Sequence, residues 1–121
     1  MQEKSDGRFP ATRRLKRRGD FERVYRSGIA WKGGYFSLYL LSSGCLGRMG
    51  IVITRRWGNA VERNKMKRFL REIFRRHPLL FSETDVIVQP QKTCKGKCLG
   101  EIERHLIEEF KAASRLEETN G

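Results

Sequence analysis

The stretch that decides the fold runs from Gly58 to Arg75 and reads GNAVERNKMKRFLREIFR. If each residue advances about 100° around a helix, the apolar side chains of this stretch share one side. They are Met66, Phe69, Leu70, Ile73 and Phe74. This stripe predicts a helix that packs against the rest of the domain. We expect it to begin near Asn59 and to end at His77, because the residue before a proline avoids the helical conformation.

The opposite side of this predicted helix is polar and cationic. It carries Asn64, Lys67, Arg68, Arg71 and Arg75, with Arg63 and Lys65 at its boundary. Helices that face only solvent usually alternate the sign of their charges, with Glu three or four residues from Lys. Here only Glu62 and Glu72 offset the positive charge. The face therefore favours contact with a polyanion over a simple solvated surface.

Charge is uneven over the whole chain as well. The 121 residues carry a net charge of +12, and residues 8–76 hold nineteen Lys and Arg against four Asp and Glu. Such a basic body indicates a nucleic-acid binder. An anionic membrane surface could also attract it, but no apolar run approaches the roughly 20 residues of a spanning helix. The N-terminus lacks the apolar core of a signal peptide, so we expect a cytoplasmic protein.

Periodicity outside the basic helix predicts a small domain of helices and strands. Phe21, Val24 and Tyr25 recur at helical spacing. Asp20 can cap this helix, and Gly28 fits its left-handed closing position. The expected strands are residues 29–31, 35–41, 49–53 and 85–88, and a last helix covers residues 102–113. A sheet covered by helices on one face is the economical core for this order. We expect one domain over residues 1–121, with loose ends at about 1–12 and 116–121.

Neither an active site nor a metal centre is evident in the sequence. A protein nuclease needs clustered carboxylates for metal ions, or a His base beside a nucleophile. Structural roles are favoured for His77, at a helix end, and for His105, in an amphipathic helix. The spacing of Cys94 and Cys98 suits zinc, but a structural zinc site needs four ligands, and Cys45 lies far away in sequence. We expect free thiols, no catalytic residue and no metal ligand.

Aromatic side chains are a further signal. Phe21 and Tyr25 lie one helical turn apart, beside the basic run of residues 13–18. Rings beside a basic surface can stack on unpaired bases, and they can equally belong to the core. The composition leaves both interpretations open for this pair. For Phe36 and Phe74 it favours the core.

The motif GNAVERNKMKR at residues 58–68, followed by Leu70-Arg71-Glu72, closely resembles the signature of the bacterial ribonuclease P protein subunit. The resemblance covers about residues 13 to 113. Its supporting positions are Leu15, Phe21, Val24, Tyr25, Gly28 and residues 35–39, 50–53 and 85–88.

This resemblance implies a fold and a function. The implied fold is an α+β two-layer sandwich, a four-stranded mixed sheet with helices in the order α-β-β-β-α-β-α, with a left-handed crossover through the basic helix. The implied function is to assist a catalytic RNA, the RNA component of ribonuclease P, in removing 5′ leaders from precursor tRNA. Catalysis and Mg²⁺ binding would lie mainly with the RNA. The expected partners are the catalytic RNA and precursor tRNA, with no membrane contact and no protein oligomer.

The resemblance also implies two RNA-binding surfaces. The basic helix face, which meets the catalytic RNA, takes in Arg63, Asn64, Lys65, Lys67, Arg68, Arg71 and Arg75. A cleft between the first helix and the sheet, which holds the single-stranded leader, takes in Phe21, Tyr25, Phe36, Arg55, Arg56 and Lys92. The chain departs from the family pattern at Lys65, where Arg is usual, and near Gln91, where a basic residue is usual.

Three other functions remain open on the composition alone. An RNA-binding protein with no link to cleavage, such as a ribosomal protein, would carry the same charge pattern. A protein-only nuclease is disfavoured by the scarcity of carboxylates in the basic part. A DNA-binding protein is disfavoured because no recognition-helix dimer pattern is present.

Overall fold

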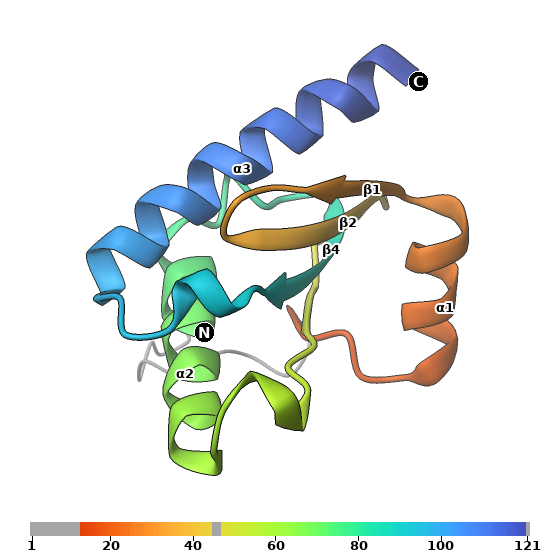
Figure 1. The fold of residues 1–121 in the computed structure, drawn as a ribbon. Coiled ribbons are helices and arrows are strands. Elements are labelled where there is room, and N and C mark those ends of the chain that lie inside the picture. Colours follow the sequence, from red (N-terminus) through yellow and green to blue (C-terminus); the bar gives the residue numbers. More distant parts are fainter. Residues whose placement is uncertain (1–12, 45–46, 121) are drawn as a thin grey trace, which may run out of the picture.

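The computed structural model describes residues 13–44 and 47–120. Its helices and strands follow the predicted order (Figure 1). They are α1 (Arg18–Ser27), β1 (Ile29–Lys32), β2 (Phe36–Ser42), β3 (Met49–Ile51), α2 (Ala60–Arg76), β4 (Thr84–Pro90) and α3 (Leu99–Asn120). Two 3-10 turns that the sequence did not predict follow the parallel strands, η2 (Arg55–Trp57) after β3 and η3 (Lys92–Cys94) after β4.

The sheet is mixed, as predicted. Its strand order is β1-β2-β4-β3. β2 pairs antiparallel with β1 and β4, whereas β3 pairs parallel with β4. A parallel pair needs a crossover connection, and α2 lies in the segment that provides it. The left hand of this crossover stays a prediction.

The main core lies between one face of the sheet and the helices α2 and α3. Alternate residues of a strand point to opposite faces, and Phe36, Leu38 and Leu40 of β2 are fully buried on this side. Leu70, Ile73 and Phe74 of α2 join them, as do Ile102, Leu106 and Phe110 of α3. The apolar stripe predicted for the basic helix is therefore confirmed as its packing face.

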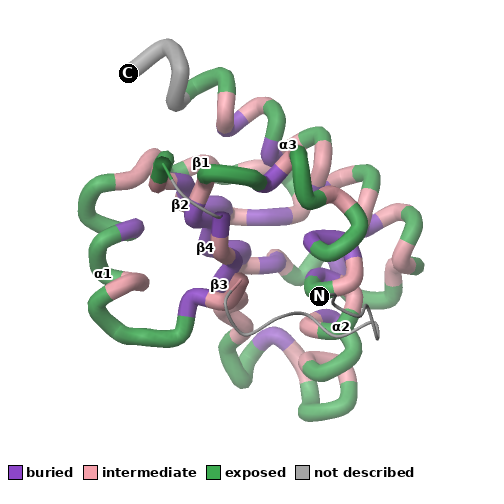
Figure 2. The backbone as a smooth tube through the Cα atoms, turned by 180° about the vertical axis from the view of Figure 1, so that it is seen from behind, coloured by how far each residue is buried: buried purple, intermediate pink, exposed green. Residues whose placement is uncertain are grey.

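The other face of the sheet is covered by α1. A second cluster contains the buried residues Leu15, Val24 and Ile87, with Phe21, Tyr39, Leu41 and Val52 packed against it. The expectation of helices on one face thus holds for α2 and α3 but not for α1. The reason is visible in β2, where Tyr39 and Leu41 make the second face apolar as well. Buried positions accordingly run along β2 and β4, while most of α1 is exposed (Figure 2).

Two local predictions for α1 were wrong. Arg17, without a side-chain cap, stands at the N-cap position, and Asp20 lies within the first turn. Gly28 has φ −87°, so it is extended and not left-handed. A Cβ at this position would collide with the carbonyl oxygens of Val24 and Leu40. Glycine is therefore needed here for the close approach of α1 to β2.

The last helix is longer than predicted. It continues to Asn120, past the expected loose end at residue 116, because Leu116 and the glutamates after it are good helix formers. The loose end expected at residues 1–12 lies outside the described residues. None of the helices in the described ranges combines the length and apolar character needed to span a bilayer.

Candidate nucleic-acid interface

A capping box starts α2 at the predicted position. The side chain of Asn59 accepts a hydrogen bond from the backbone N–H of Glu62 at 2.8 Å. The side chain of Glu62 accepts one from the backbone N–H of Asn59 at 2.9 Å. Such a reciprocal pair satisfies two backbone donors at the helix end. Together with the buried stripe, it fixes which side chains of α2 face outward.

The two acids of α2 are already engaged. Glu72 accepts hydrogen bonds from Arg75 at 2.6 Å and from Arg76 at 3.0 Å, and the bond from Arg75 is the main cause that lowers its pKa. Glu62 belongs to the capping box and pairs with Lys95 at 3.6 Å. Neither carboxylate pairs with the cations in the middle of the helix.

Two of the predicted RNA-binding residues have partners within the chain. Arg63 donates to the carbonyl oxygen of Gly58 at 2.6 Å, and Arg75 binds Glu72. The remaining five form what we call the cationic helix face: Asn64, Lys65, Lys67, Arg68 and Arg71. Within residues 13–44 and 47–116, no carboxylate pairs with Lys67, Arg68 or Arg71. Unpaired cations in a row along one helix suit a phosphate backbone.

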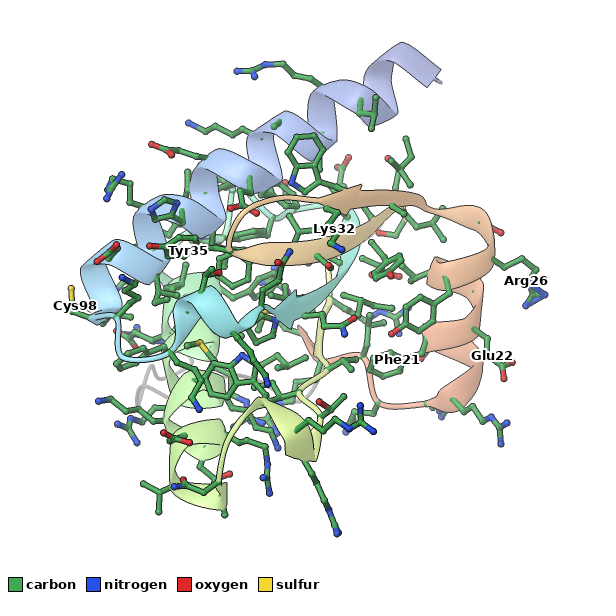
Figure 3. All side chains as sticks on the ribbon, viewed as in Figure 1. Phe21, Glu22, Arg26, Lys32, Tyr35 and Cys98 are labelled. Atoms are coloured by element: carbon green, nitrogen blue, oxygen red, sulfur yellow. The ribbon has the colours of Figure 1, made fainter. Side chains whose placement is uncertain are left out.

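The aromatic residues of α1 meet the second face of the sheet. The Phe21 ring lies directly over Gly50 of β3, so that a Cβ at Gly50 would stand 2.7 Å from the ring. Phe21 points toward the sheet while Glu22 and Arg26 point away from it (Figure 3). Tyr25 is 43% exposed, and its ring contacts Tyr39 of β2 edge to face at 4.8 Å. Phe21 lines a hollow beside β3, and Tyr25 lines a more open one with Glu22 and Arg26. We call these two hollows together the α1 cleft; the leader-binding role of both residues stays a prediction.

Phe36 does not belong to this cleft. Its side chain is fully buried in the main core, on the face of the sheet covered by α2 and α3. Phe36 and Tyr39 stand three positions apart in β2, so they point to opposite faces. The role implied for Phe36 by the resemblance is wrong, whereas the core role favoured by its own residue pattern is confirmed.

A groove of about 250 Å³ joins the two predicted surfaces. We call it the β3 groove. Its apolar lining comes from Leu15, Phe21, Met49 and Ile51. Its cations come from the segment before α1 and from α2: Arg14, Lys16, Lys67 and Arg71. No carboxylate is among these lining residues. A side chain assigned to the leader thus shares one hollow with two side chains assigned to the catalytic RNA.

Arg14 and Lys16 are interface residues that the site prediction omitted, although the basic run at residues 13–18 was the signal for them. The backbone N–H of Leu15 donates to the carbonyl oxygen of Met49 at 3.0 Å, which holds this segment along the edge strand β3. Burial and then the charge of Arg14 lower the pKa of Arg71. The two guanidinium groups are thus near enough for the charge of Arg14 to act on Arg71.

A buried carboxylate fixes α1 on the sheet, and the sequence analysis missed it. Asp85 is fully buried and accepts hydrogen bonds from Arg48 at 2.9 Å and from Arg23 of α1 at 3.3 Å. Arg48 also reaches Asp20 of α1 at 3.2 Å. A buried charge is tolerated when it is paired and hydrogen-bonded. This network sets the position of α1, and hence the width of the cleft beside Phe21.

Arg55, Arg56 and Lys92 lie together at one edge of the sheet. Because β3 and β4 are parallel, the turns that follow them, η2 and η3, meet at the same edge. The Trp57 Nε1–H donates to the carbonyl oxygen of Gln91 at 3.0 Å and ties the two turns together. All three cations are exposed. Gln91, near which the resemblance implies a basic residue, donates its side-chain amide to the carbonyl oxygen of Gly33 at 2.7 Å.

Both histidines have structural partners. The Nε2 of His77 lies 2.7 Å from a carboxylate oxygen of Glu103, and His105 stacks on Tyr35 with the ring centroids 3.7 Å apart. Cys94 is buried, and its thiol donates to the carbonyl oxygen of Tyr35, whereas Cys98 is exposed. Cys45 lies outside the described residues. In the part of the chain that the structure describes, no three His, Cys, Asp or Glu side chains gather in a way that could hold a metal ion.

Comparisons with known proteins agree with this arrangement. A family model described as Ribonuclease P matches residues 9–114. The ribonuclease P protein component of Thermotoga maritima is 37% identical over 86 residues, which cover 69% of this chain and 74% of the relative. That of Dictyoglomus turgidum is 34% identical over 112 residues, covering 89% and 94%.

Solved structures give the same result. The RNase P protein from Staphylococcus aureus superimposes with a TM-score of 0.77 at 32% identity, covering 84% of this chain and 94% of that one. The RNase P protein from Thermotoga maritima gives a TM-score of 0.74 at 31% identity, with 82% and 96% covered.

Proposed function

Because the chain belongs to the ribonuclease P protein family, we propose that it binds the catalytic RNA and the 5′ leader of precursor tRNA and assists removal of that leader. The chain is thereby a subunit of an endoribonuclease that produces mature tRNA 5′ ends. The observation that carries the proposal is the cationic helix face. It presents Lys67, Arg68 and Arg71 to a polyanion without a carboxylate partner among the described residues.

We place the chemical step in the RNA. In this proposal Mg²⁺ is bound mainly by the RNA component, and the protein supplies position and charge. The partners of the two histidines support a chemical step in the RNA. His77 contacts Glu103 and His105 stacks on Tyr35, so both rings are held by structural contacts. The protein would act in the cytoplasm as one copy bound to RNA.

The leader is the part of the substrate that the α1 cleft fits. An unpaired strand offers bases for stacking, and Phe21 and Tyr25 offer rings. Arg14 and Lys16 line the β3 groove together with Phe21 and suit the phosphates of the same strand. Mature tRNA lacks this strand, so the protein would distinguish substrate from product.

Reconstituted cleavage tests the proposal. Precursor tRNA is incubated with the catalytic RNA alone, with the protein alone, and with both, over a range of Mg²⁺ concentrations. We expect the protein to lower the Mg²⁺ concentration that the RNA needs and to cleave nothing by itself. An RNA-binding protein with another task would leave the Mg²⁺ requirement unchanged, and a protein-only nuclease would cleave without the RNA.

A further inference from the structure

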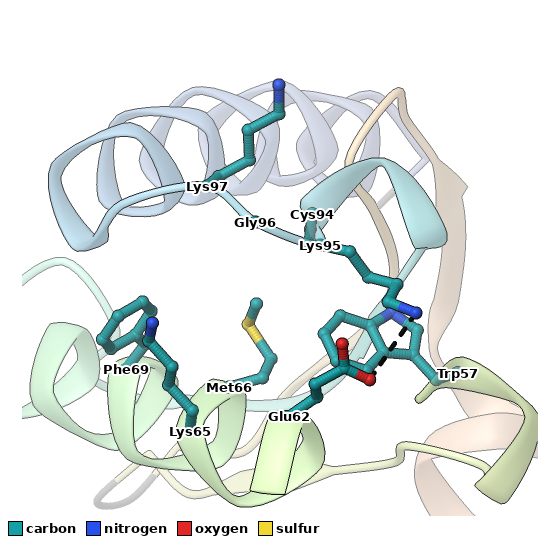
Figure 4. A pocket seen from close by; sticks show the side chains of 9 residues that line it. All are labelled: Trp57, Glu62, Lys65, Met66, Phe69, Cys94, Lys95, Gly96 and Lys97. Carbon is teal, nitrogen blue, oxygen red and sulfur yellow. Dashed lines mark ion pairs between the residues drawn. The ribbon is translucent and has the colours of Figure 1, made fainter. Parts of the chain in front are cut away.

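A second hollow, of about 170 Å³, lies on the other flank of α2 (Figure 4). We call it the α2 pocket. Its floor includes Trp57, Met66 and Phe69, and its rim includes the side chains of Lys65 and Lys95. Lys97 borders the pocket as well, but its ammonium group points away from it (Figure 4). It is formed between α2 and the segment that joins η3 to α3. The predicted site residues included Lys65 but not this pocket.

The position of the α2 pocket follows from helix geometry. Lys65 and Lys67 are two residues apart, so they point about 200° away from one another. Arg68 lies between these directions on the outer side of the helix. The cationic helix face therefore runs from the β3 groove on one flank, across Arg68, to the α2 pocket on the other. A strand bound along this face would reach the pocket.

The chemistry of the pocket combines two features. The ammonium of Lys65 lies 5.6 Å from the centroid of the Phe69 ring, and that of Lys95 lies 5.9 Å from the Trp57 ring. These distances allow cation–π contact, so each aromatic surface has a cation beside it. The pocket has one carboxylate, that of Glu62, and it pairs with Lys95 at 3.6 Å. Lys65 has no carboxylate partner in the described part of the chain. A suitable occupant has a flat apolar surface, which would contact the aromatic rings, and a negative group, which would contact the lysines of the rim.

The size of the pocket limits the occupant. Its volume is below the roughly 300 Å³ at which pockets for drug-sized ligands begin. An unpaired nucleotide meets both requirements, because it joins a single flat base to a phosphate. A paired helix would offer phosphates at the rim but no base for the floor.

We propose that the α2 pocket holds one unpaired nucleobase of the catalytic RNA, stacked on the Phe69 ring, with an adjoining phosphate between Lys65 and Lys95. The inference rests on the proposed function. The catalytic RNA is the source of the base because the pocket borders the cationic helix face. The aromatic residues assigned to the leader, Phe21 and Tyr25, lie on the opposite face of the sheet.

Base-specific chemical probing of the holoenzyme tests this inference. Dimethyl sulfate and a carbodiimide together report the Watson–Crick edges of all four bases. The test variants are Phe69→Leu, which keeps an apolar side chain but removes the ring, and Lys95→Ala. The control is Lys111→Ala. It removes one exposed charge from α3, about three turns after the start of that helix and away from the pocket.

We expect the wild-type protein to protect at least one unpaired base of the catalytic RNA. Phe69→Leu should restore the reactivity of that base and weaken RNA binding by about 5- to 150-fold, as expected for one lost stacking contact. Lys95→Ala should weaken binding without full loss of the protection, and Lys111→Ala should match the wild type. Thermal melts verify that each variant is folded.

Two results would overturn the inference. In the first, the same bases of the catalytic RNA are protected by the Phe69→Leu variant and by the wild type. In the second, the protection lost in Phe69→Leu lies on a base of precursor tRNA and not of the catalytic RNA. Either could occur while the wild-type protein still lowers the Mg²⁺ requirement, in which case the proposed function stands. A wild-type protein that fails to bind the catalytic RNA would overturn both.

Discussion

Individual side chains of the strands decide which surface is open to a ligand. The resemblance placed Phe36 in the leader cleft, yet Phe36 is fully buried, and it is Tyr39 of the same strand that faces α1. Alternation along β2 was enough to separate them. The alternation pattern could not reveal why glycine is needed at Gly28 and Gly50. Gly28 lies against the backbone of β2 and Gly50 against the Phe21 ring of α1, and both contacts are made only by the tertiary fold.

Phe36→Ala should act on stability and not on leader binding. Removing a fully buried Phe leaves a cavity, and such changes typically cost about 3–5 kcal/mol of the free energy of unfolding. Denaturant unfolding of the two proteins measures the loss. A variant as stable as the wild type, but selectively weak in binding precursor tRNA, would return Phe36 to the cleft.

Cys94 should show a pH-dependent contribution to stability. Burial raises the pKa of its thiol from 9.0 to about 12. The unfolded chain therefore loses this proton first, so the contribution is complete below pH 9 and is lost as the pH rises toward 12. Unfolding of wild type and Cys94→Ala at pH 8 and pH 11 measures it, and we expect the variant to lose less stability over this range. An equal loss in both proteins would contradict the buried thiol.

At the scale of elements, α2 was the most predictable part. Its apolar stripe, its start at Asn59 and its cationic side all follow from a period of 3.6 residues and from capping chemistry. The start of α1 was less predictable. Asp20 is a good capping residue by type, but its carboxylate pairs with Arg48, which lies 28 positions away in sequence. Neither that pair nor the burial of Asp85 leaves a local signal.

Replacing Arg68 and Arg71 together with Ala should weaken binding to the catalytic RNA and flatten its dependence on salt. Each phosphate contact releases about one counterion on binding. Loss of two contacts should therefore make the slope of log K against log salt less steep by up to about two units. Both side chains are exposed on the side of α2 away from the core, so the fold should persist. The control removes two exposed charges from α3, with Arg104→Ala and Lys111→Ala. If the two double variants had the same slope, the cationic helix face would lose its assigned role.

At the scale of the molecule, the order of elements and the existence of a basic and an aromatic surface could be predicted from the sequence. The arrangement of those surfaces could not. Lys67 and Arg71 lie about fifty residues from Phe21 in sequence, and they share the β3 groove because β3 and α2 lie side by side. Arg14 and Lys16 enter the same groove through pairing of their segment with β3.

In the proposed function, two surfaces of the molecule have separate tasks. The cationic helix face would hold the catalytic RNA whatever the substrate. The α1 cleft would contribute only when a leader is present. The two tasks can be separated by variants in α1 and α2, because each surface has side chains that the other lacks.

The measurement that tests this account most directly is the affinity of the reconstituted holoenzyme for precursor tRNA and for mature tRNA, with Phe21→Ala compared with the wild type. Phe21→Ala removes one stacking contact, so we expect the binding free energy of precursor tRNA to weaken by about 1–3 kcal/mol. The affinity for mature tRNA should be almost unchanged. Val24→Ala is the matched control, because Val24 is buried in the same helix and cannot reach the leader. The Phe21→Ala protein must melt like the control. If it then loses equal affinity for both tRNAs, or loses none for either, the account is contradicted.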